Sequence, residues 1–316
     1  MAEVWTMGEL LCEIIRPEAD MPLDQTGIFY GPYPSGAPAI FIDTVARLGH
    51  SAGIVGGVGK DDFGKCILDR LGQDGVDCSQ IKQYGNGTTG VAFVTYFSDG
   101  DRRFLFHFPD TPATWPTAPD ARQLGGDVRY FHIMGCSLTA KKEFGQQILK
   151  LMRELVAGGV KISFDPNIRP ELMRDEAAHL MAAEVMRNCS VFLPGVSELL
   201  MVSGKETIGD AVKACFENPV LEVIALKNGS EGSTIFSREG SVSLGIYPVD
   251  VKDPTGAGDC FDGAFICGLL EGKPMLEAAE QATAAASINT GALGPMEGKV
   301  TRAAVEKVIA SHSRTN

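Results

Sequence analysis

The sequence has no apolar run approaching the ~20 residues that a membrane-spanning helix needs. It also lacks a basic N-terminal segment leading into an apolar stretch, the pattern of a secretory signal, so we expect a cytoplasmic protein with no membrane partner. Lys and Arg total 28 against 40 Asp and Glu, a net charge of −12, and no basic cluster interrupts this acidic surplus. A nucleic-acid partner is therefore not expected.

Cysteine pairs and two common phosphate-binding motifs are also absent. The eight cysteines show no CxxC pair and no metal-binding spacing with His, so in a chain of 316 residues they indicate reduced, buried thiols. The glycine-rich segment 56–61 is not a Walker loop, because Asp61 replaces Ser or Thr. It is not a dinucleotide fingerprint either, because Asp62 stands at the third Gly position. The segment is either a ligand loop or a plain helix start.

Apolar strand patterns alternate with helix patterns along most of the chain. Strands are predicted at 51–55, 128–134, 160–164, 189–193, 221–226, 232–237 and 240–246, and helices at 35–48, 61–72, 141–157, 175–187, 196–203, 206–216, 275–290 and 301–311. This order predicts an α/β fold with a doubly wound, mostly parallel sheet flanked by helices, and one domain over residues 1–316.

Residues 90–108 break this alternation. Two β-rich runs, 91–97 and 103–108, flank an Asp-Gly turn, which is typical of a β-hairpin. With strands from 10–34, including one at 28–30, the hairpin is expected to form a small β-sheet lid. A lid with one apolar face needs a partner, so we expect a homodimer through the lid.

Four polar segments follow predicted strands: Gly8-Glu9, 165–169, 227–232 and 253–259. Ligands of open parallel sheets bind beyond the carboxyl ends of the strands. The sequence therefore predicts one active-site crevice at which these four segments meet.

The segment 253–266, which reads DPTGAGDCFDGAFI, changes from a glycine-rich loop into a helix. Gly256 and Gly258 permit positive φ and close approach to a ligand, and the first helical turn presents unpaired N–H groups to an anion. Asp259 beside this positive end should stay ionised and can take a proton from an alcohol that attacks a phosphoryl group. An ordinary turn with an N-capping Asp is the alternative.

This segment resembles, without a gap, the second signature of the ribokinase (PfkB) family of carbohydrate kinases, nearest to fructokinase, tagatose kinase and 2-keto-3-deoxygluconate kinase-like members. The resemblance implies a ribokinase-like fold, with Asp259 as catalytic base and the amides of Gly256, Ala257 and Gly258 as anion hole. It also implies ATP and Mg²⁺ as cofactors, and transfer of the γ-phosphate to a primary hydroxyl of a small sugar.

Residues 35–49 resemble the family's first signature, with Ser35 in place of a Gly and Ile40 in place of an Asn. The resemblance implies that Gly36 and Ala37 bring backbone close to the sugar. It also implies that two acidic residues, Glu9 and Glu13, contact sugar hydroxyls, although Glu13 could equally be a solvated lid residue.

Residues 165–169 resemble the family's Asp-Pro-Asn-x-Arg segment. This implies that Asn167 lies at the substrate and that Arg169 holds substrate or the transferred phosphate in a guanidinium fork. A surface residue on a proline-bounded turn is the alternative for Arg169.

The nucleotide side is implied by residues 227–232, which resemble the family's nucleotide loop. Residues expected to contact the nucleotide are Lys227, Gly229, Ser230, Gly232, Gly256 and Gly258. Gly195 replaces the Asn of the family's Asn-x-x-Glu motif. This leaves Glu198 to position hydrated Mg²⁺, unless that Glu only interacts with the dipole of its helix.

Other polar residues have weaker assignments. Asp253 and Thr255 could offer oxygens to a monovalent cation such as K⁺, as in some relatives. Asp262 is expected to cap its helix or face solvent, and the histidines His107, His132 and His179 are expected to be structural.

The substrate is inferred from residues 107–111, which read HFPDT. 2-Keto-3-deoxygluconate kinase-like members often carry an Arg after the lid hairpin, suited to a carboxylate, and none stands here. This favours a neutral ketohexose such as fructose or tagatose. The alternatives are a 2-keto-3-deoxygluconate kinase, a nucleoside kinase and a non-catalytic sugar-binding protein with a kinase fold.

Overall fold

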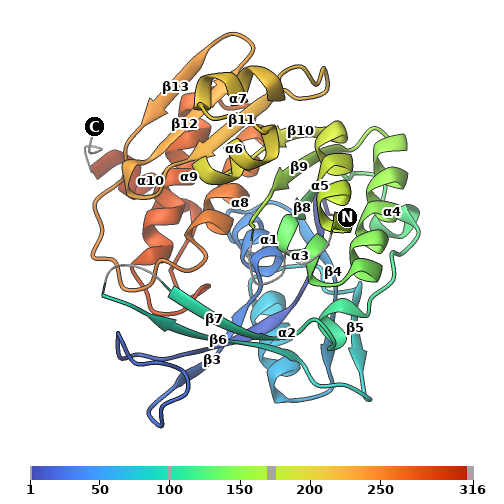
Figure 1. Cartoon of the computed structure of the whole chain (residues 1–316), viewed down its shortest axis with the longest axis vertical. Helices are drawn as coiled ribbons and strands as arrows, with labels where there is room; N and C mark the ends of the chain where they lie inside the picture. The colour runs from blue at the N-terminus through green and yellow to red at the C-terminus, as the bar shows by residue number, and fades with distance from the viewer. Residues whose placement is uncertain (1, 99–101, 169–175, 312–316) are drawn as a thin grey trace.

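The structure is a computed structural model that describes residues 2–98, 102–168 and 176–311 (Figure 1). Within these ranges nine strands form the main sheet, in the order β13-β12-β11-β10-β9-β8-β1-β4-β5. Their bounds are β1 Val4–Met7, β4 Ala52–Gly59, β5 Ile81–Tyr84, β8 Tyr130–Met134, β9 Lys161–Asp165, β10 Cys189–Phe192, β11 Val223–Lys227, β12 Ser233–Ser237 and β13 Ser241–Leu244. The strands from β11 to β5 are parallel, and β12 and β13 pair antiparallel. The predicted mostly parallel, doubly wound sheet is confirmed.

Helices cover both faces of this sheet. One apolar core is formed with α1 (Ala37–Arg47), α2 (Asp62–Gln73), α8 (Ala257–Leu270), α9 (Met275–Thr290) and α10 (Arg302–Ser311). The other is formed with α4 (Lys142–Ala157), α5 (Glu176–Asn188), α6 (Val196–Ser203) and α7 (Ile208–Cys215). Short helices fill the connections: α3 (Gly135–Ala140), η1 (Pro112–Thr114), η2 (Ala121–Leu124) and η3 (Gly229–Glu231).

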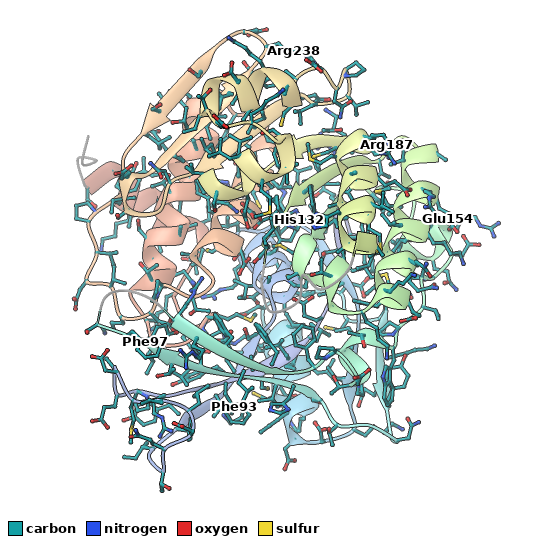
Figure 2. All side chains as sticks on the ribbon, in the orientation of Figure 1. Phe93, Phe97, His132, Glu154, Arg187 and Arg238 are labelled. Atoms are coloured by element: carbon teal, nitrogen blue, oxygen red, sulfur yellow. The ribbon has the colours of Figure 1, made fainter. Side chains whose placement is uncertain are left out.

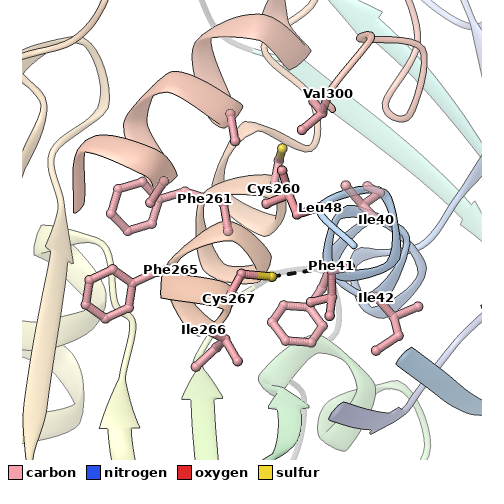
Figure 3. Close-up of a cluster of buried hydrophobic side chains, with 14 of the residues drawn as sticks. Ile40, Phe41, Ile42, Leu48, Cys260, Phe261, Phe265, Ile266, Cys267 and Val300 are labelled. Carbon is pink, nitrogen blue, oxygen red and sulfur yellow. Dashed lines mark hydrogen bonds between the residues drawn. The ribbon is translucent and has the colours of Figure 1, made fainter. Parts of the chain in front are cut away.

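Helix α8 is packed on all sides, and its contact with α1 is close (Figure 3). Residues 259–268 are all buried. A Cβ at Gly263 would lie 2.6 Å from the carbonyl oxygen of Phe41, so glycine is needed where the two helices meet. Cys267 Sγ lies 4.0 Å from the carbonyl oxygen of Val45, the contact drawn as a dashed line. This packing fixes the N-terminus of α8 relative to the sheet.

A second sheet with the order β3-β2-β6-β7 lies beside the main body, at the bottom of Figure 1. Its strands are β2 (Leu11–Ile15), β3 (Tyr30–Ser35), β6 (Gly90–Tyr96) and β7 (Arg102–His107). β2 and β6 pair parallel, while β3 and β7 pair antiparallel at the two edges. The predicted lid sheet is confirmed.

Some predicted boundaries were wrong. The strand expected at 28–30 is β3, which begins at Tyr30 and runs through two prolines to Ser35. Proline is tolerated there because β3 is an edge strand with one unpaired side. The sequence also gave no expectation of β5 or α3, which are short.

The interior agrees with the cysteine prediction, since all eight cysteines are free thiols and six are buried. Figure 2 places His132 in the middle of the molecule, with Glu154, Arg187 and Arg238 at its periphery. Among the described residues, no helix combines the length and the apolar character that crossing a membrane would require.

Candidate active site

A cavity of about 290 Å³ lies between the inner face of the lid and the carboxyl ends of the parallel strands. The lid contributes Leu11, Glu13, Arg102, Phe104 and Phe106 to its wall. The main domain contributes Glu9, Gly36, Ala37, Asp165, Asn167, Glu198, Lys227, Gly229, Gly256, Gly258 and Asp259. The four polar segments predicted to converge therefore do meet in one place.

A second cavity, of about 400 Å³, adjoins the first on the far side of the α8 N-terminus. Four residues, Lys227, Gly229, Pro254 and Gly258, line both cavities. Ser230, Gly232 and Ala257 line the second cavity only, with an apolar wall from Val249, Val251 and Phe261. The N-terminus of α8 thus stands at the junction of two spaces.

The turn before α8 has the geometry expected of an anion hole. Gly256 is the N-cap residue with φ 78°, and a Cβ there would lie 2.6 Å from the carbonyl oxygen of Pro295. The first intrahelical bond runs from the amide of Cys260 to the carbonyl of Gly256, at 2.8 Å. The amides of the first turn have no acceptor within the helix, and that of Ala257 donates to the Pro254 carbonyl at 3.4 Å. Such a helix N-terminus is a common place for an anion to bind.

Asp259 lies in this first turn, 7% exposed, and Asn167 Nδ2 donates to its Oδ1 at 3.0 Å. Asn167 adopts φ 39°, an uncommon left-handed conformation for a residue with a side chain. Its amide N–H donates to Asp165 Oδ1 at 2.9 Å, which closes the turn after β9. The Asp-Pro-Asn turn therefore holds one oxygen of the predicted base.

A buried ion cluster lies beneath this turn. Lys227 Nζ donates to Asp165 Oδ2 at 2.9 Å and to both carboxylate oxygens of Asp262 at 3.0 Å. Burial alone would raise the pKa of Asp165, but the charge and hydrogen bond of Lys227, together with a hydrogen bond from Asp262, lower that pKa. Burial raises the pKa of Asp262 well above its usual value. The two carboxylates therefore share the single Lys227 ammonium.

The expectation for Asp262 was wrong. Its side chain is 0% exposed and paired with Lys227, so it neither faces solvent nor caps the helix. The reason is that α8 is buried on every side, which leaves no wet face for a carboxylate. Two sequence features could have indicated the pair, an Asp within an apolar helix and a Lys at the end of a buried strand, since each needs a partner.

The histidine beside this cluster is structural, as expected. The His132 ring stacks on Phe41 with centroids 3.7 Å apart, and its Nδ1 lies 2.9 Å from Ser163 Oγ. Burial lowers the pKa of His132 to about 3, so the ring is neutral.

Two buried glutamates line the part of the first cavity that lies under the lid. Glu9 accepts hydrogen bonds from Ser137 Oγ and Cys136 Sγ. Glu13 Oε1 accepts from Ser35 Oγ at 2.8 Å, while its buried Oε2 has no hydrogen-bond partner among the described residues. Burial raises the pKa of Glu13 to about 7. Ser35, the departure from the family's glycine, therefore orients Glu13, which is not a solvated lid residue.

The second departure, Ile40, lines the same cavity at 3% exposure. Gly36 brings the start of α1 close to the segment between β1 and β2: its φ is 110°, and a Cβ would lie 2.4 Å from the carbonyl oxygen of Glu9. Asp61, from the other glycine-rich segment, caps α2 by accepting from the amide of Gly64 at 2.8 Å. It does not line the cavity, which favours the plain helix start.

Glu198 has a clear local role. Its Oε2 accepts from the Gly195 amide and its Oε1 from the Ile168 amide, each at 2.7 Å. It therefore caps α6 and ties this helix to the turn that carries Asn167. Arg169, predicted to reach the phosphate, lies outside the described residues.

Asp253 and Thr255 lie at the entry to α8, and a lid residue reaches them. Tyr96 Oη donates to Asp253 Oδ1 at 2.6 Å and lies 2.8 Å from Thr255 Oγ1, and Arg102 Nη1 lies 3.5 Å from that same Thr255 oxygen. Sequence reasoning missed both Tyr96 and Arg102. The alternation of the hairpin was visible, but nothing in it showed which face lies over the cavity.

The helix N-terminus, the carboxylate held by Asn167 and the two adjoining cavities thus lie together at the carboxyl edge of the sheet. The chain matches the profile of the pfkB family carbohydrate kinases over residues 1–302, and it belongs to that family. It is therefore a carbohydrate kinase, an enzyme that phosphorylates sugars.

Curated relatives and solved structures agree with this family. "Probable fructokinase-2" of Arabidopsis thaliana is 29% identical over 281 residues, covering 88% of this chain and 84% of the relative. A putative Ribokinase II from E. coli, solved with ATP and Mg²⁺, is 37% identical, with a TM-score of 0.91 and coverage of 99% and 100%. A fructokinase from Vibrio cholerae O395, solved with fructose, ADP and potassium, shares the fold at 20% identity, with a TM-score of 0.83 and coverage of 98% of each chain.

Proposed function

We propose that this kinase transfers the γ-phosphate of Mg-ATP to a primary hydroxyl of a neutral ketohexose of the fructose or tagatose type. The observation that carries the proposal is the position of Asp259. It lies at the N-terminus of α8, where the lid-covered cavity meets the second cavity, and Asn167 holds one of its oxygens. A proton acceptor and an anion hole thus stand where the two substrates would touch.

In the proposed reaction Asp259 removes the proton of the sugar hydroxyl as its oxygen bonds to the γ-phosphorus. The bond from that phosphorus to the bridging oxygen breaks, and ADP leaves with this oxygen. The amides of Gly256, Ala257 and Gly258 receive charge on the transferring group, so catalysis is mostly positioning and electrostatics. A contribution from Arg169 stays a prediction.

The second cavity suits a nucleotide. Its wall is mainly apolar, with Gly229, Ser230 and Gly232 at the loop after β11, and Thr283 Oγ1 in the wall is buried without a partner among the described residues. At Gly232 a Cβ would lie 2.0 Å from the carbonyl oxygen of Leu244, so only glycine fits the turn. The ATP-bound E. coli structure, 37% identical, supports ATP as the nucleotide.

The donor set also fits a hydrated Mg²⁺. The carboxylates of Asp165 and Glu198 line the first cavity near the α8 N-terminus. Both oxygens of Glu198 already accept backbone amides, and those of Asp165 accept from the Asn167 amide and from Lys227. Both residues would therefore act through water, which Mg²⁺ retains readily. When bound, the ion offsets phosphate charge. Lys227, predicted at the nucleotide, is held by the two aspartates below it.

For the sugar, we propose contacts from Glu9, Glu13 and the backbone at Gly36 and Ala37. Carboxylates accept hydrogen bonds from hydroxyl groups, and a wall with three acidic residues, counting Asp259, disfavours an anionic sugar.

One observation favours the second candidate, 2-keto-3-deoxygluconate kinase. Arg102 lines the cavity from β7, with its guanidinium 5.5 Å from the centroid of the Phe104 ring. A guanidinium in the sugar cavity could pair with a carboxylate. An Arg102→Gln variant should lose activity on the acidic sugar selectively, and keep it on fructose.

A panel of ketohexoses, aldohexoses, pentoses, 2-keto-3-deoxygluconate and nucleosides, with ADP release as the readout, tests the substrate. Asp259→Asn tests the base: we expect turnover to fall at least ~100-fold, while sugar affinity by calorimetry changes little. The control is Asp69→Asn, an exposed carboxylate on α2. Unchanged turnover in Asp259→Asn would refute the base assignment. A wild type that binds sugar without releasing ADP would support the non-catalytic alternative.

We also propose a homodimer through the outer face of the lid. Phe93 (Figure 2) on that face contacts the rings of Phe29 and His107. Leu105 and Ile28 are 48% and 67% exposed. A second copy would cover this apolar surface. Light scattering should give twice the chain mass for the wild type and the monomer mass for Leu105→Glu. A wild-type monomer at micromolar concentration would contradict the proposal.

The cytoplasmic location stays a prediction.

A further inference from the structure

The loop that leads into the anion hole depends on one buried carboxylate. Asp253 is 0% exposed; its Oδ1 accepts from the Thr255 amide and its Oδ2 from the Gly294 amide, each at 2.9 Å. These bonds set the turn at Gly256, from which the amides of α8 begin. A buried carboxylate of this kind must be compensated by further donors or by a cation.

The lid supplies the further donor. Tyr96 is the last residue of β6, and its hydroxyl donates to Asp253 Oδ1 at 2.6 Å across the gap between the two sheets. Burial and the neighbouring carboxylate raise the pKa of Tyr96, so the hydroxyl keeps its proton throughout the working pH range. Its cross-strand partner is Arg102, whose Nη1 approaches Thr255 Oγ1 to 3.5 Å. Two neighbouring lid side chains thus converge on this loop.

The oxygens that a monovalent cation would need are engaged by these and other donors. Asp253 Oδ1 accepts two hydrogen bonds and Oδ2 accepts one. Thr255 Oγ1 is bonded to Tyr96, and the Thr255 carbonyl accepts from Asn289 Nδ2 at 3.2 Å. Asn289 Nδ2 also donates to the Pro295 carbonyl at 3.1 Å. Each carboxylate and carbonyl oxygen of the predicted K⁺ site thus already accepts a hydrogen bond, and the Asn289 carboxamide joins the Thr255 and Pro295 carbonyls as a cation would. These residues therefore do not offer the ion an open set of ligands.

We infer that Tyr96 is a positioning residue for the transfer reaction, and that its hydroxyl, with the Asn289 carboxamide, makes the anion hole of this kinase independent of a monovalent cation. The inference rests on the proposed function. Because the Tyr96 hydroxyl belongs to the lid, the state of the anion hole depends on whether the lid is closed. Opening the lid removes a donor from Asp253, so the anion hole is complete only when the lid covers the sugar. This coupling suppresses transfer to water in the absence of sugar.

The test compares the wild type, Tyr96→Phe and the control Tyr130→Phe in buffers whose monovalent cation is either K⁺ or tetramethylammonium. Tyr130 begins β8, at the end of the sheet opposite the cavities, where its amide bonds to Glu3. We expect wild-type kcat to agree within about twofold in the two buffers. In Tyr96→Phe we expect kcat to fall roughly 10- to 100-fold, as for loss of one hydrogen bond to a charged group, with the sugar KM little changed. Tyr130→Phe should match the wild type.

Calorimetry with a non-hydrolysable ATP analogue and Mg²⁺ provides a readout besides activity. Wild-type affinity should be equal in the two buffers, and Tyr96→Phe should bind several-fold more weakly. A wild type that needs K⁺ for turnover or for nucleotide affinity overturns the inference even if Tyr96→Phe fails to fold. So does a folded Tyr96→Phe with unchanged kcat. If the panel finds no sugar substrate, the proposed function fails, whereas the binding measurements still decide the role of Tyr96.

Discussion

Replacing Lys227 by Met should cost this kinase both stability and turnover. The side chain is 17% exposed, and its ammonium group bonds two carboxylates that are themselves almost inaccessible, Asp165 at 4% and Asp262 at 0%. Met keeps the length of the chain and removes the charge, which leaves Asp165 ionised and without its cation. Breaking one partner out of a buried pair costs about 3–5 kcal/mol.

The expected shift of Tm follows from the size of the protein. An unfolding entropy of about 2.1 cal/mol/K per residue, for 316 residues, converts this loss into a Tm lower by roughly 5–8 °C. Turnover should fall about tenfold as well, because Asp165 orients Asn167 and through it Asp259. Differential scanning fluorimetry and initial rates measure the two effects.

The pH dependence separates this explanation from a general packing defect. In the wild type the pKa of Asp165 is lowered, so its pairing stabilises the fold above the ordinary Asp pKa and is lost as the pH falls through the lowered value. In Lys227→Met the unpaired carboxylate is penalised only while it is charged. The difference in Tm should therefore be largest near pH 8 and shrink toward pH 5.

The matched control is Lys161→Met. Lys161 forms a 2.7 Å ion pair with Glu222 at the surface, where the two side chains are 45% and 50% exposed. Such a pair contributes less than about 1 kcal/mol. The reasoning would be refuted if Lys227→Met were no less stable than Lys161→Met, or if its loss of Tm did not vary with pH.

The remaining predictions concern the sugar side and the anion-hole turn. Burial raises the pKa of Glu13 from 4.5 to about 7, so the cost in folding free energy of ionising this buried carboxyl grows as the pH rises between these values. Glu13→Gln should therefore raise Tm at pH 8 and leave it unchanged near pH 4.5. In the wild type the sugar KM should increase as the pH falls below about 7, and Glu13→Gln should abolish this trend; a KM equally pH-dependent in both would contradict the contact. Gly256→Ala places a Cβ 2.6 Å from the Pro295 carbonyl at φ 78°, so we expect kcat to fall and the fold to lose roughly 1–3 kcal/mol in chemical denaturation. In α2, by contrast, the Cβ added by Gly72→Ala meets no atom within 4 Å, so this variant should be neutral or stabilising. Similar losses of unfolding free energy in Gly256→Ala and Gly72→Ala would refute the explanation by backbone strain at Gly256.

The sequence was sufficient for the parts of the site that local backbone chemistry determines. The glycines at 256 and 258, followed by a small and apolar helix, indicated a tight turn that opens into a helix N-terminus at the cavity, and the Asp-Pro-Asn turn indicated a second polar loop. Both predictions rest on neighbours in the chain, and the parallel order of the strands then brought the loops together.

What could not be predicted depends on contacts between distant segments. Asp262 looked like a surface residue because its partner, Lys227, comes from another element 35 residues away. Tyr96 and Arg102 lie on a hairpin with aromatic residues on both faces, so alternation could not show which face lies over the cavity. The two prolines of β3 hid this strand from the sequence pattern because proline is rare in strands, and only the edge position of β3 makes them acceptable.

Helix α8 combines two properties that proteins often keep apart. Its first turn lies between the two cavities, and the rest of it is among the most deeply packed parts of the chain. A segment so embedded cannot rearrange for each turnover without loosening the whole interior, so movement is left to the four-stranded sheet above it. Changes in sugar preference can then arise by altering that cover, while the apparatus that handles the nucleotide remains as it is.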